Sequence, residues 1–499
     1  MGRPKAGRIT LMALFSLLLA AAATAQSVDS SGPLPSFGSV ATPRPINPAA
    51  NTTNPSARAT QTLNPYLGST PDDKVVDGEI RLSLSDAVSR GLRFNLGLID
   101  SEQADAGVRA AREHAFSELL PQISARAQQS YQQLSYRELN IKLPVQAGFQ
   151  LPPTSGNFGY SEAQITAQSP VVNLSLRDKY KQQKALEASS LLSTKDARDV
   201  VVYAVGAAYF QVVASQARLD TTKAALASAQ ELNAQVEDQY KSEVSPEIDS
   251  LRAKVELSTA EQRVVDATND LEKDKLTLDR VTGVPLQQLW APSSDYGYVP
   301  LLDLKSEESH ASETRYDIAS MKQAVTAAEL GVKAARAERL PEVSLVAGYG
   351  GGGVNPANYN QVYGVQGTVS VPIFTSGRIR SDVHAADAAL VQRRAEYRDL
   401  AGRVDYDVRV ARLDAQASES AVKVAAGNRT LAEKALTQSE DRYKNGVTNY
   451  LEVLQAQEAM VAANENYIAS LFSFNVAKIA LARALGSSES RLTTFFSER

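Results

Sequence analysis

The side chains most often used in catalysis and metal binding are few in this sequence and far apart. The three histidines, His114, His310 and His384, do not stand at the spacing of metal ligands. The glycine run from Gly350 to Gly353 lacks the lysine and the helix start of a phosphate-binding loop, so we interpret it as a flexible connection between strands. Pairs of acidic residues are frequent, as expected of charged helix faces. The sequence therefore predicts no enzyme activity, no catalytic residue, no cofactor and no metal site.

The first 25 residues predict a secretory signal peptide. Arg3, Lys5 and Arg8 form a basic start, an apolar stretch follows, and small residues at 23–25 suit cleavage. The apolar stretch is short for a membrane anchor, and the lack of cysteine excludes a lipidated start and a disulfide framework. No later run of about 18 apolar residues occurs. We therefore expect the exported chain in the periplasm, outside the cell, or in the outer membrane as a β-barrel.

Composition and charge narrow the possibilities further. The chain carries a formal charge of −4, and removal of the basic signal makes the remainder more acidic, which argues against nucleic acid as a partner. Residues 26–79 are rich in Ser, Pro, Asn, Thr and Ala, which predicts an extended or disordered leader.

The remainder of the chain contains two similar halves. Residues 98–127 match 318–347 at a constant offset of 220, and 239–241 match 442–444 at an offset of 203. The 17-residue difference falls largely in a longer loop of the first half, at 134–160. Similarity at a fixed offset indicates two copies of one structural unit.

Each half predicts the same elements in the same order. A helix ends at a proline, two runs with a period of two flank a loop, and a very long helix leads through a turn into a last helix. The predicted helices are 95–119, 175–242 and one ending at Gly283, then 315–339, 378–444 and one ending at Gly486; the clearest strands are 163–172, 343–349 and 365–371. About 67 helical residues span roughly 100 Å, which indicates coiled-coil packing.

The strand pairs favour a membrane barrel built from several copies of the chain. Four strands cannot close a barrel, and open strand edges are not tolerated in lipid. Two copies would give eight strands around a filled interior, whereas three copies would give twelve strands around a water-filled passage. Short alternating runs also occur in other folds, so periodicity alone leaves open a periplasmic coiled-coil scaffold or adaptor without a membrane barrel.

From about residue 80 to 487, the chain resembles the TolC family of outer-membrane efflux proteins. The resemblance rests on the duplicated layout, on the segment 442–448 and on the joints between helices and strands, marked by Pro121, Pro341, Pro372 and Gly377. Pro170 marks the equivalent joint of the first half, which departs from the motif because the residues after it include neither the aromatic residue nor the glycine. It implies a mainly α fold with a transmembrane β-barrel contribution. The implied structure is a TolC-like trimeric duct, with four strands per chain in a 12-stranded barrel and a long antiparallel α-helical periplasmic barrel. It also implies a homotrimer in outer-membrane lipid that works with a periplasmic membrane-fusion adaptor and an inner-membrane transporter.

The same resemblance assigns a periplasmic gate. Glu452 matches the first acidic position of the family's constriction, Gln455 stands where a second acid is expected, and Asp249 is the counterpart of Glu452 in the first half. Three carboxylates around a narrow axis would attract cations and repel anions. Arg442 and Tyr443 are expected to tie the tip closed by hydrogen bonds between helices.

The turns beside the gate are expected to dock the adaptor. Gly446 suits a turn that needs positive φ, and Thr448 or Asn449 can cap the returning helix. Glu243 replaces the glycine in the first half, so the adaptor is expected to meet two unequal turns. The predicted docking residues are Gly446, Val447, Thr448, Asn449, Val244, Ser245 and Pro246.

The predicted function is that of an outer-membrane exit channel of a tripartite efflux or type I secretion system, with a large periplasmic portion. It would passively conduct substrates received from the adaptor and the pump; the alternative is the scaffold or adaptor without a barrel. Trp290 is expected to pack locally between the halves. The expected organisation is a signal peptide at 1–25, the leader at 26–79, repeats at 80–290 and 315–487, a linker at 291–314 and a tail at 488–499.

Overall fold

The computed structural model describes residues 64–71, 75–135, 154–293, 297–301, 314–354, 359–486, 488–489 and 496. All of them belong to one compact unit, Thr60–Arg499. The predicted signal peptide, residues 26–63 of the predicted leader, His310 and most of the long loop expected at 134–160 lie outside the described residues. The domain boundaries given above remain predictions.

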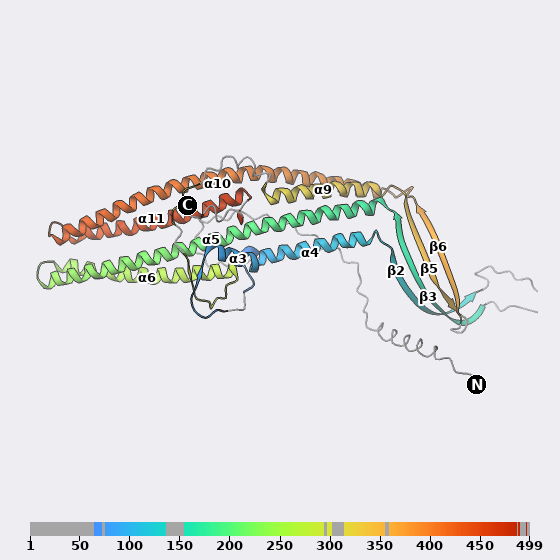
Figure 1. Cartoon of the computed structure of the whole chain (residues 1–499), viewed down its shortest axis with the longest axis horizontal. Coiled ribbons are helices and arrows are strands. Elements are labelled where there is room, and N and C mark those ends of the chain that lie inside the picture. Colours follow the sequence, from blue (N-terminus) through green and yellow to red (C-terminus); the bar gives the residue numbers. More distant parts are fainter. Residues whose placement is uncertain are drawn as a thin grey trace, which may run out of the picture. The chain divides into compact units, whose positions relative to one another are not determined.

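Two β-hairpins form one antiparallel sheet at an end of this unit (Figure 1). Strands β2 (Gln122–Ser135) and β3 (Thr154–Val172) come from the first half, and β5 (Glu342–Gly353) and β6 (Asn360–Ser370) come from the second. The strand order is β2-β3-β5-β6, so the two halves meet where β3 pairs with β5. The predicted hairpin in each half is confirmed.

The glycine run is not a connection between strands, as the sequence suggested. Gly350 to Gly353 form the end of β5, where Gly350 pairs with Gln164 on one side and Val362 on the other. A Cβ atom on Gly351 would lie 2.1 Å from the Asn360 carbonyl oxygen, so a larger residue does not fit there. The run resembles a loop in the sequence, because the requirement for glycine comes from the neighbouring strands. The local sequence does not reveal this requirement.

The helices follow in the predicted order. Helices α4 (Leu96–Ser117) and α9 (Tyr316–Ala337) lead into the hairpins, α5 (Leu174–Lys241) and α10 (Arg378–Lys444) leave them, and α6 (Glu247–Thr282) and α11 (Tyr450–Ala484) return. Capping explains the accuracy of several predicted ends. The Asn173 side chain accepts a hydrogen bond from the Leu176 N–H at the start of α5, and Gly283 takes the left-handed conformation that ends α6.

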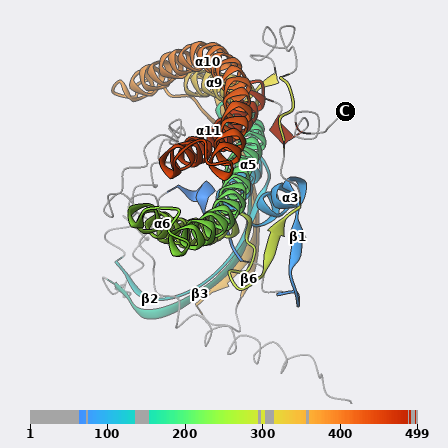
Figure 2. The same cartoon turned by 90° about the vertical axis from the view of Figure 1, so that its left-hand side faces the viewer.

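The long helices lie side by side in a row. Near the sheet, the contacts between helices give the order α4-α5-α9-α10, and toward the other end they give α6-α5-α11-α10. Figure 2, seen from the tips, shows the pair α10–α11 above the pair α5–α6. Helix α10 therefore forms one edge of the row, and α4 and α6 form the opposite edge.

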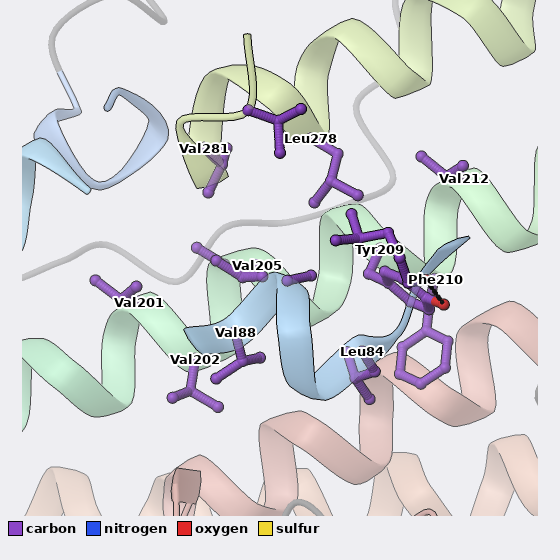
Figure 3. Close-up of a cluster of buried hydrophobic side chains, with 14 of the residues drawn as sticks. Leu84, Val88, Val201, Val202, Val205, Tyr209, Phe210, Val212, Leu278 and Val281 are labelled. Carbon is purple, nitrogen blue, oxygen red and sulfur yellow. Dashed lines mark hydrogen bonds between the residues drawn. The ribbon is translucent and has the colours of Figure 1, made fainter. Parts of the chain in front are cut away.

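The main hydrophobic core lies where α3 (Leu84–Phe94) packs against the middle of α5 (Figure 3). Val201, Val205 and Tyr209 of α5 are fully buried there, together with Leu278 of α6. The Tyr209 hydroxyl donates a hydrogen bond to the Leu82 carbonyl (3.0 Å), which satisfies its polar atom inside the core.

Helix α5 is also the one described helix that is long and apolar enough to cross a membrane by length and composition. Of its most apolar window, 56% is buried inside the structure. The apolar residues of α5 therefore serve the core, whose members Val201 to Val212 belong to this helix.

Short strands attach the chain between the halves to the same core. Strand β1 (Ile80–Leu82) pairs in parallel with β4 (Trp290–Pro292). Trp290 is buried, and its indole N–H donates to the Asp279 carboxylate (2.8 Å). The expected local packing of Trp290 is confirmed.

The last part of the predicted leader is structured, which the composition did not indicate. Residues 64–71 contain the 3-10 helix η3 (Pro65–Leu67), and the Asn95 side chain donates to the Tyr66 carbonyl (2.8 Å). The Tyr66 ring lies against Gly97, where a Cβ atom would be 2.4 Å from the ring. Backbone hydrogen bonds from the Leu96 N–H to the Gly68 carbonyl (2.9 Å) and from the Thr70 N–H to the Phe94 carbonyl (2.9 Å) also hold this segment in place.

Candidate functional site

The predicted functional residues lie at opposite ends of the helical row (Figure 1). The tips lie where α5 meets α6 and α10 meets α11, and the helix–strand joints lie at the end that carries the sheet. In the part of the chain that the structure describes, no group of three or more His, Cys, Asp or Glu side chains could hold a metal ion. The candidate site therefore consists of the tips and the faces of the sheet.

The tip between α10 and α11 is a tight turn stabilised by backbone hydrogen bonds. Gly446 takes a φ of 71°, as predicted, and its N–H donates to the Tyr443 carbonyl (2.9 Å). The Val447 N–H donates to the Arg442 carbonyl (2.8 Å). These bonds satisfy carbonyl groups that the end of α10 would otherwise leave free.

Glu452 is oriented by three neighbours in the first turn of α11. Its N–H donates to the Asn449 side chain (3.2 Å), and the Thr448 hydroxyl donates to its carboxylate. The Arg442 Nε atom lies 3.6 Å from the Glu452 carboxylate. Both charged side chains remain about half exposed, so this ion pair contributes little stability. Glu452 is thus a positioned carboxylate that solvent still reaches.

The tip between α5 and α6 follows a similar path with different residues. Glu243 takes a φ of 57°, a conformation that side chains rarely adopt and that Gly446 allows in the other tip. Pro246 precedes α6 and provides no side-chain cap, unlike Asn449 before α11. The first tip is therefore the less favourable of the two in local conformation.

The other predicted gate residues occupy separate places. Asp249, in the first turn of α6, pairs with Arg252 of the same helix (3.3 Å). Gln455 is exposed on α11, three residues after Glu452 and hence on the same side of the helix. Within one chain the structure brings Arg442 and Glu452 together, and the role of all five gate residues stays a prediction.

A hydrogen bond between the two helical hairpins lies just behind the tips. The Tyr443 hydroxyl of α10 donates to the Gln239 side-chain oxygen of α5 (2.6 Å). Burial, followed by the nearby Asp249 carboxylate, raises the pKa of Tyr443. The phenol is therefore protonated at neutral pH and remains a donor. Sequence analysis identified Tyr443 but not Gln239, because the repeat aligned Gln239 with Arg442 and gave no sign of the pairing across the row.

The same place holds a small hydrophobic cluster that joins all four tip helices. Tyr450, at the start of α11, is buried, and its ring lies 6.2 Å from that of Tyr443 at an angle of 66°. Burial raises the pKa of Tyr450 to about 12. The buried members are Leu232, Val236, Ala253, Tyr443, Tyr450 and Val453. The sequence analysis missed Tyr450, although its place beside Asn449 at a helix start was a usable signal.

Prolines and left-handed residues make the joints between sheet and helices. Pro170 lies at a shift of register in β3, and Pro372 follows the end of β6. Ser376 and Gly377 then take φ values of 50° and 86°, and α10 begins. Pro121 and Pro341 each precede the first residue of a strand. All five predicted joint residues thus lie between helix and strand, or at the strand end beside it.

One carboxylate beside the joints forms ion pairs that connect three helices. Glu338, which follows α9, accepts from Lys179 of α5 (3.4 Å) and from Arg378 of α10 (3.0 Å). These contacts connect α5, α9 and α10 where the three helices approach the sheet; Lys179 and Arg378 are about half exposed, so the pairs add little stability.

The strand register shows that the sheet has one apolar and one polar face. Residues paired across antiparallel strands share a face, and side chains alternate along each strand. The apolar face carries, among others, Ile123, Ala125, Ile165, Leu345, Tyr349, Tyr363, Val365 and Val369. The polar face carries, among others, Gln122, Ser124, Gln128, Gln164, Gln168, Ser344, Gln366 and Thr368. Such a sheet suits lipid on one side and water on the other.

Two characterised relatives have names that refer to export. The chain is 26% identical over 316 residues to the pyoverdine export outer membrane protein OpmQ of Pseudomonas putida, covering 61% of this chain and 65% of OpmQ. It is 24% identical over 348 residues to the cation efflux system protein CusC of Escherichia coli, covering 66% of this chain and 74% of CusC. The match thus spans slightly less than two thirds of OpmQ.

Solved channels share the fold over almost their full length. The outer membrane protein VceC of Vibrio cholerae superposes with a TM-score of 0.69 at 18% identity, covering 81% of this chain and 97% of VceC. The CmeC outer membrane channel of Campylobacter jejuni superposes with a TM-score of 0.70 at 17% identity, covering 87% and 95%. The predicted TolC-like fold is confirmed.

The family model for outer membrane efflux proteins matches residues 98–284 and 309–487, which together make up most of the chain. The two matched ranges correspond to the two halves, each with its strand hairpin and long helices. The chain belongs to the outer membrane efflux protein family, a family of passive channels of the outer membrane and not of enzymes.

Proposed function

We propose that this protein is the exit channel of a tripartite efflux or type I secretion system, and that three copies form the duct. The observation that carries the proposal is the four-stranded sheet, which has a lipid-compatible face, a water-compatible face and two free edges. Within one chain, β2 and β6 each have one unpaired edge. Such edges are costly in lipid, so the sheet requires further strands.

The two edges differ, which determines how copies can join. If β6 of one copy pairs with β2 of the next, each contact is head-to-tail, and a rotation that closes produces a ring. Two copies would supply eight strands, whose interior is filled by side chains, whereas three supply twelve and leave a passage. The proposed trimer follows from the need for a water-filled lumen.

The helical row supports the same arrangement. Its edge helices carry large apolar side chains that are exposed in the single chain. On α6 these are Ile248, Leu251, Val255 and Val265, and on α10 they are Tyr406, Leu413, Val424 and Leu431. Contact between α10 of one copy and α6 of the next would bury both sets. Sheet and helices thus favour the same head-to-tail order.

At the tips we assign gating to Glu452, Arg442 and Tyr443, with Asp249 and Gln455 in a supporting role. The hydrogen bond between Tyr443 and Gln239 links the two helical hairpins, and Arg442 lies within ion-pair distance of Glu452 in the second tip. Val244 and Val447 are 75% and 66% exposed at the outermost turns. Apolar side chains there suit docking of a periplasmic adaptor, which in turn contacts an inner-membrane transporter.

Planar-bilayer recording on the purified full-length protein tests the channel. We expect heat-modifiable trimers in outer-membrane fractions and discrete conductance steps after reconstitution. A soluble monomer that gives no steps would instead support the periplasmic scaffold. Purification from crosslinked cells should recover an adaptor and a transporter, and their identity would indicate the cargo.

A further inference from the structure

We infer that Arg126 and Glu162 form a ring of alternating charge inside the barrel and set the ion selectivity of its membrane section. This inference rests on the proposed trimeric channel. It concerns the strands, which lie at the opposite end of the unit from the predicted gate (Figure 1).

The register places both side chains on the polar face of the sheet. Arg126 of β2 pairs with Gln164 of β3, and Gln128 pairs with Glu162. Arg126 and Gln128 are two residues apart, as are Glu162 and Gln164, so all four share one face. Arg126 and Glu162 are therefore diagonal neighbours on adjacent strands, at a typical separation of about 7–8 Å between backbones.

Charge is otherwise rare in the sheet, and its distribution is one-sided. The four described strands contain three charged residues, Arg126, Glu162 and Glu342. All three lie on the polar face, since Glu342 pairs with Ser370, the last residue on that face of β6. Glu342 is the first residue of β5 and accepts from Asn173 at the helix joint (3.0 Å), so it belongs to the rim. Arg126 and Glu162 are the pair that lies within the strands.

The second hairpin has the same register without the charges. Val346 is the fifth residue of β5, as Arg126 is of β2, and Val346 pairs with Gln366 as Arg126 pairs with Gln164. The next pair on this face is Gly348 with Gly364, where the first hairpin has Gln128 with Glu162. Three copies would therefore contribute three arginines and three glutamates in a threefold ring, and the second hairpins would contribute neutral wall between them.

Glycines in the second hairpin let polar side chains of β3 lie flat on the wall. A Cβ atom on Gly348 would lie 2.8 Å from the Gln164 amide nitrogen, and one on Gly352 would lie 2.6 Å from the Tyr160 hydroxyl. Both side chains thus cover glycine instead of pointing across the lumen. The passage stays open at the level of the charged ring, and solutes meet charge and amide groups on its wall.

Because the proposed ring holds equal numbers of positive and negative charges, removal of either charged residue should shift ion selectivity in a defined direction. Removing Arg126 leaves an unpaired acidic ring that favours cations, and removing Glu162 leaves an unpaired basic ring that favours anions. Charges on the wall act over the Debye length, roughly 30 Å at 0.01 M salt, 10 Å at 0.1 M and 3 Å at 1 M. Selectivity should therefore respond strongly in dilute salt and hardly at all in concentrated salt.

The test measures the potassium-to-chloride permeability ratio of the reconstituted full-length protein in KCl gradients between 0.01 and 0.1 M. We expect Arg126→Gln to raise the ratio and Glu162→Gln to lower it, each by about twofold or more. The matched controls Arg126→Lys and Glu162→Asp keep the charge and should keep the wild-type ratio. Both shifts should shrink at about 1 M KCl.

The outcomes separate the inference from the function on which it rests. Equal ratios in wild type, Arg126→Gln and Glu162→Gln, with normal conductance steps, would overturn the charged ring and leave the channel intact. Shifts in the same direction would also overturn it. Absence of steps in the wild type would contradict the channel itself. If one neutralising variant fails to form heat-modifiable trimers, the other variant still tests the charged ring. The two variants are expected to shift the permeability ratio in opposite directions, so each is a test by itself.

Discussion

Two tyrosines at equivalent places in the two halves have opposite surroundings. Tyr240 is the last residue but one of α5, and Tyr443 is the last but one of α10. Tyr240 is 40% exposed, whereas Tyr443 is 8% exposed and donates to Gln239 across the row. The helices around them differ, because α5 lies between α6 and α11 while α10 lies at an edge. Equivalent repeat positions therefore do not have equal burial, even at the same point of the helix end.

The last turns of α6 and α11 show the same divergence between repeated positions. Lys275 and Lys478 are equivalent, and each lies over an aromatic ring, Lys275 over Trp290 (6.0 Å) and Lys478 over Phe474 (5.3 Å). Lys478 is fully buried and donates to the Val299 carbonyl (3.2 Å), and burial lowers its pKa to about 8. The equivalent side chain is thus a partly buried cation paired with Glu272 in the first half (3.1 Å) and a fully buried anchor of the linker in the second.

The largest expected effect concerns the difference in packing between the two halves. Its test compares a buried residue of α5 with a buried residue of α10. Phe210→Ala leaves a cavity in the main core, and we expect it to lower the free energy of unfolding by about 3–5 kcal/mol. Val422 of α10 is also buried but belongs to none of the hydrophobic clusters of the described residues, and Val422→Ala removes a smaller group, so it should cost less. Thermal melting and the yield of membrane-inserted protein measure the difference. A loss for Val422→Ala as large as that for Phe210→Ala would contradict the expectation that the core around α5 is the main source of stability.

We expect stability to depend on pH through a buried carboxyl group of the first half. Burial raises the pKa of Asp279 to about 7, against the lowering effects of the Trp290 hydrogen bond and of Lys275. The folded chain therefore prefers the protonated carboxyl, and stability should fall as pH rises from about 4 to about 7. Ala482 occupies the equivalent place in the second half.

The matched variant for this effect is Asp279→Asn, whose side chain can still accept the Trp290 N–H. Its melting temperature should change less between pH 4 and pH 7 and should exceed that of the wild type at neutral pH. Parallel melting curves for the two proteins would show that Asp279 does not carry the effect.

At the tips, Tyr443→Phe should weaken the link between the two helical hairpins. It removes the hydroxyl bonded to Gln239 and leaves the ring against Tyr450. A loss of about 1 kcal/mol corresponds to roughly a fivefold higher ratio of open to closed channel. Tyr240→Phe is the control, since that side chain is exposed. Single-channel recordings with equal open probabilities for both variants would remove Tyr443 from the gate.

The smallest expected effect comes from the two tip carboxylates. Glu452→Gln should reduce block by multivalent cations, while stability changes by less than about 1 kcal/mol because its partner Arg442 is half exposed. Asp249→Asn, which loses a pair within its own helix, should alter block less. Identical cation block in wild type and Glu452→Gln would exclude this residue from the constriction.

Much of the fold could be predicted from the sequence because its signals are local. Prolines, capping side chains and Gly446 mark the ends of elements, and the predicted long helices 175–242 and 378–444 agree with α5 and α10 within one residue at each end. Gly350 to Gly353 were misassigned, since their requirement for small residues comes from adjacent strands. The composition of residues 64–71 predicts leader, because the contacts that hold them are made by a few side chains and by backbone groups, which hardly affect composition.

The duplication, the order of the elements and the alternation that makes one face of the sheet apolar can all be read from the amino-acid sequence. These are properties of residues close together in the chain. Three features depend on tertiary packing: Tyr443 meets Gln239, Arg126 and Glu162 are diagonal neighbours on one face of the sheet, and β2 and β6 are the free edges. Pairings of this kind depend on register and helix order, which are determined by packing between distant segments and leave no local mark in the sequence.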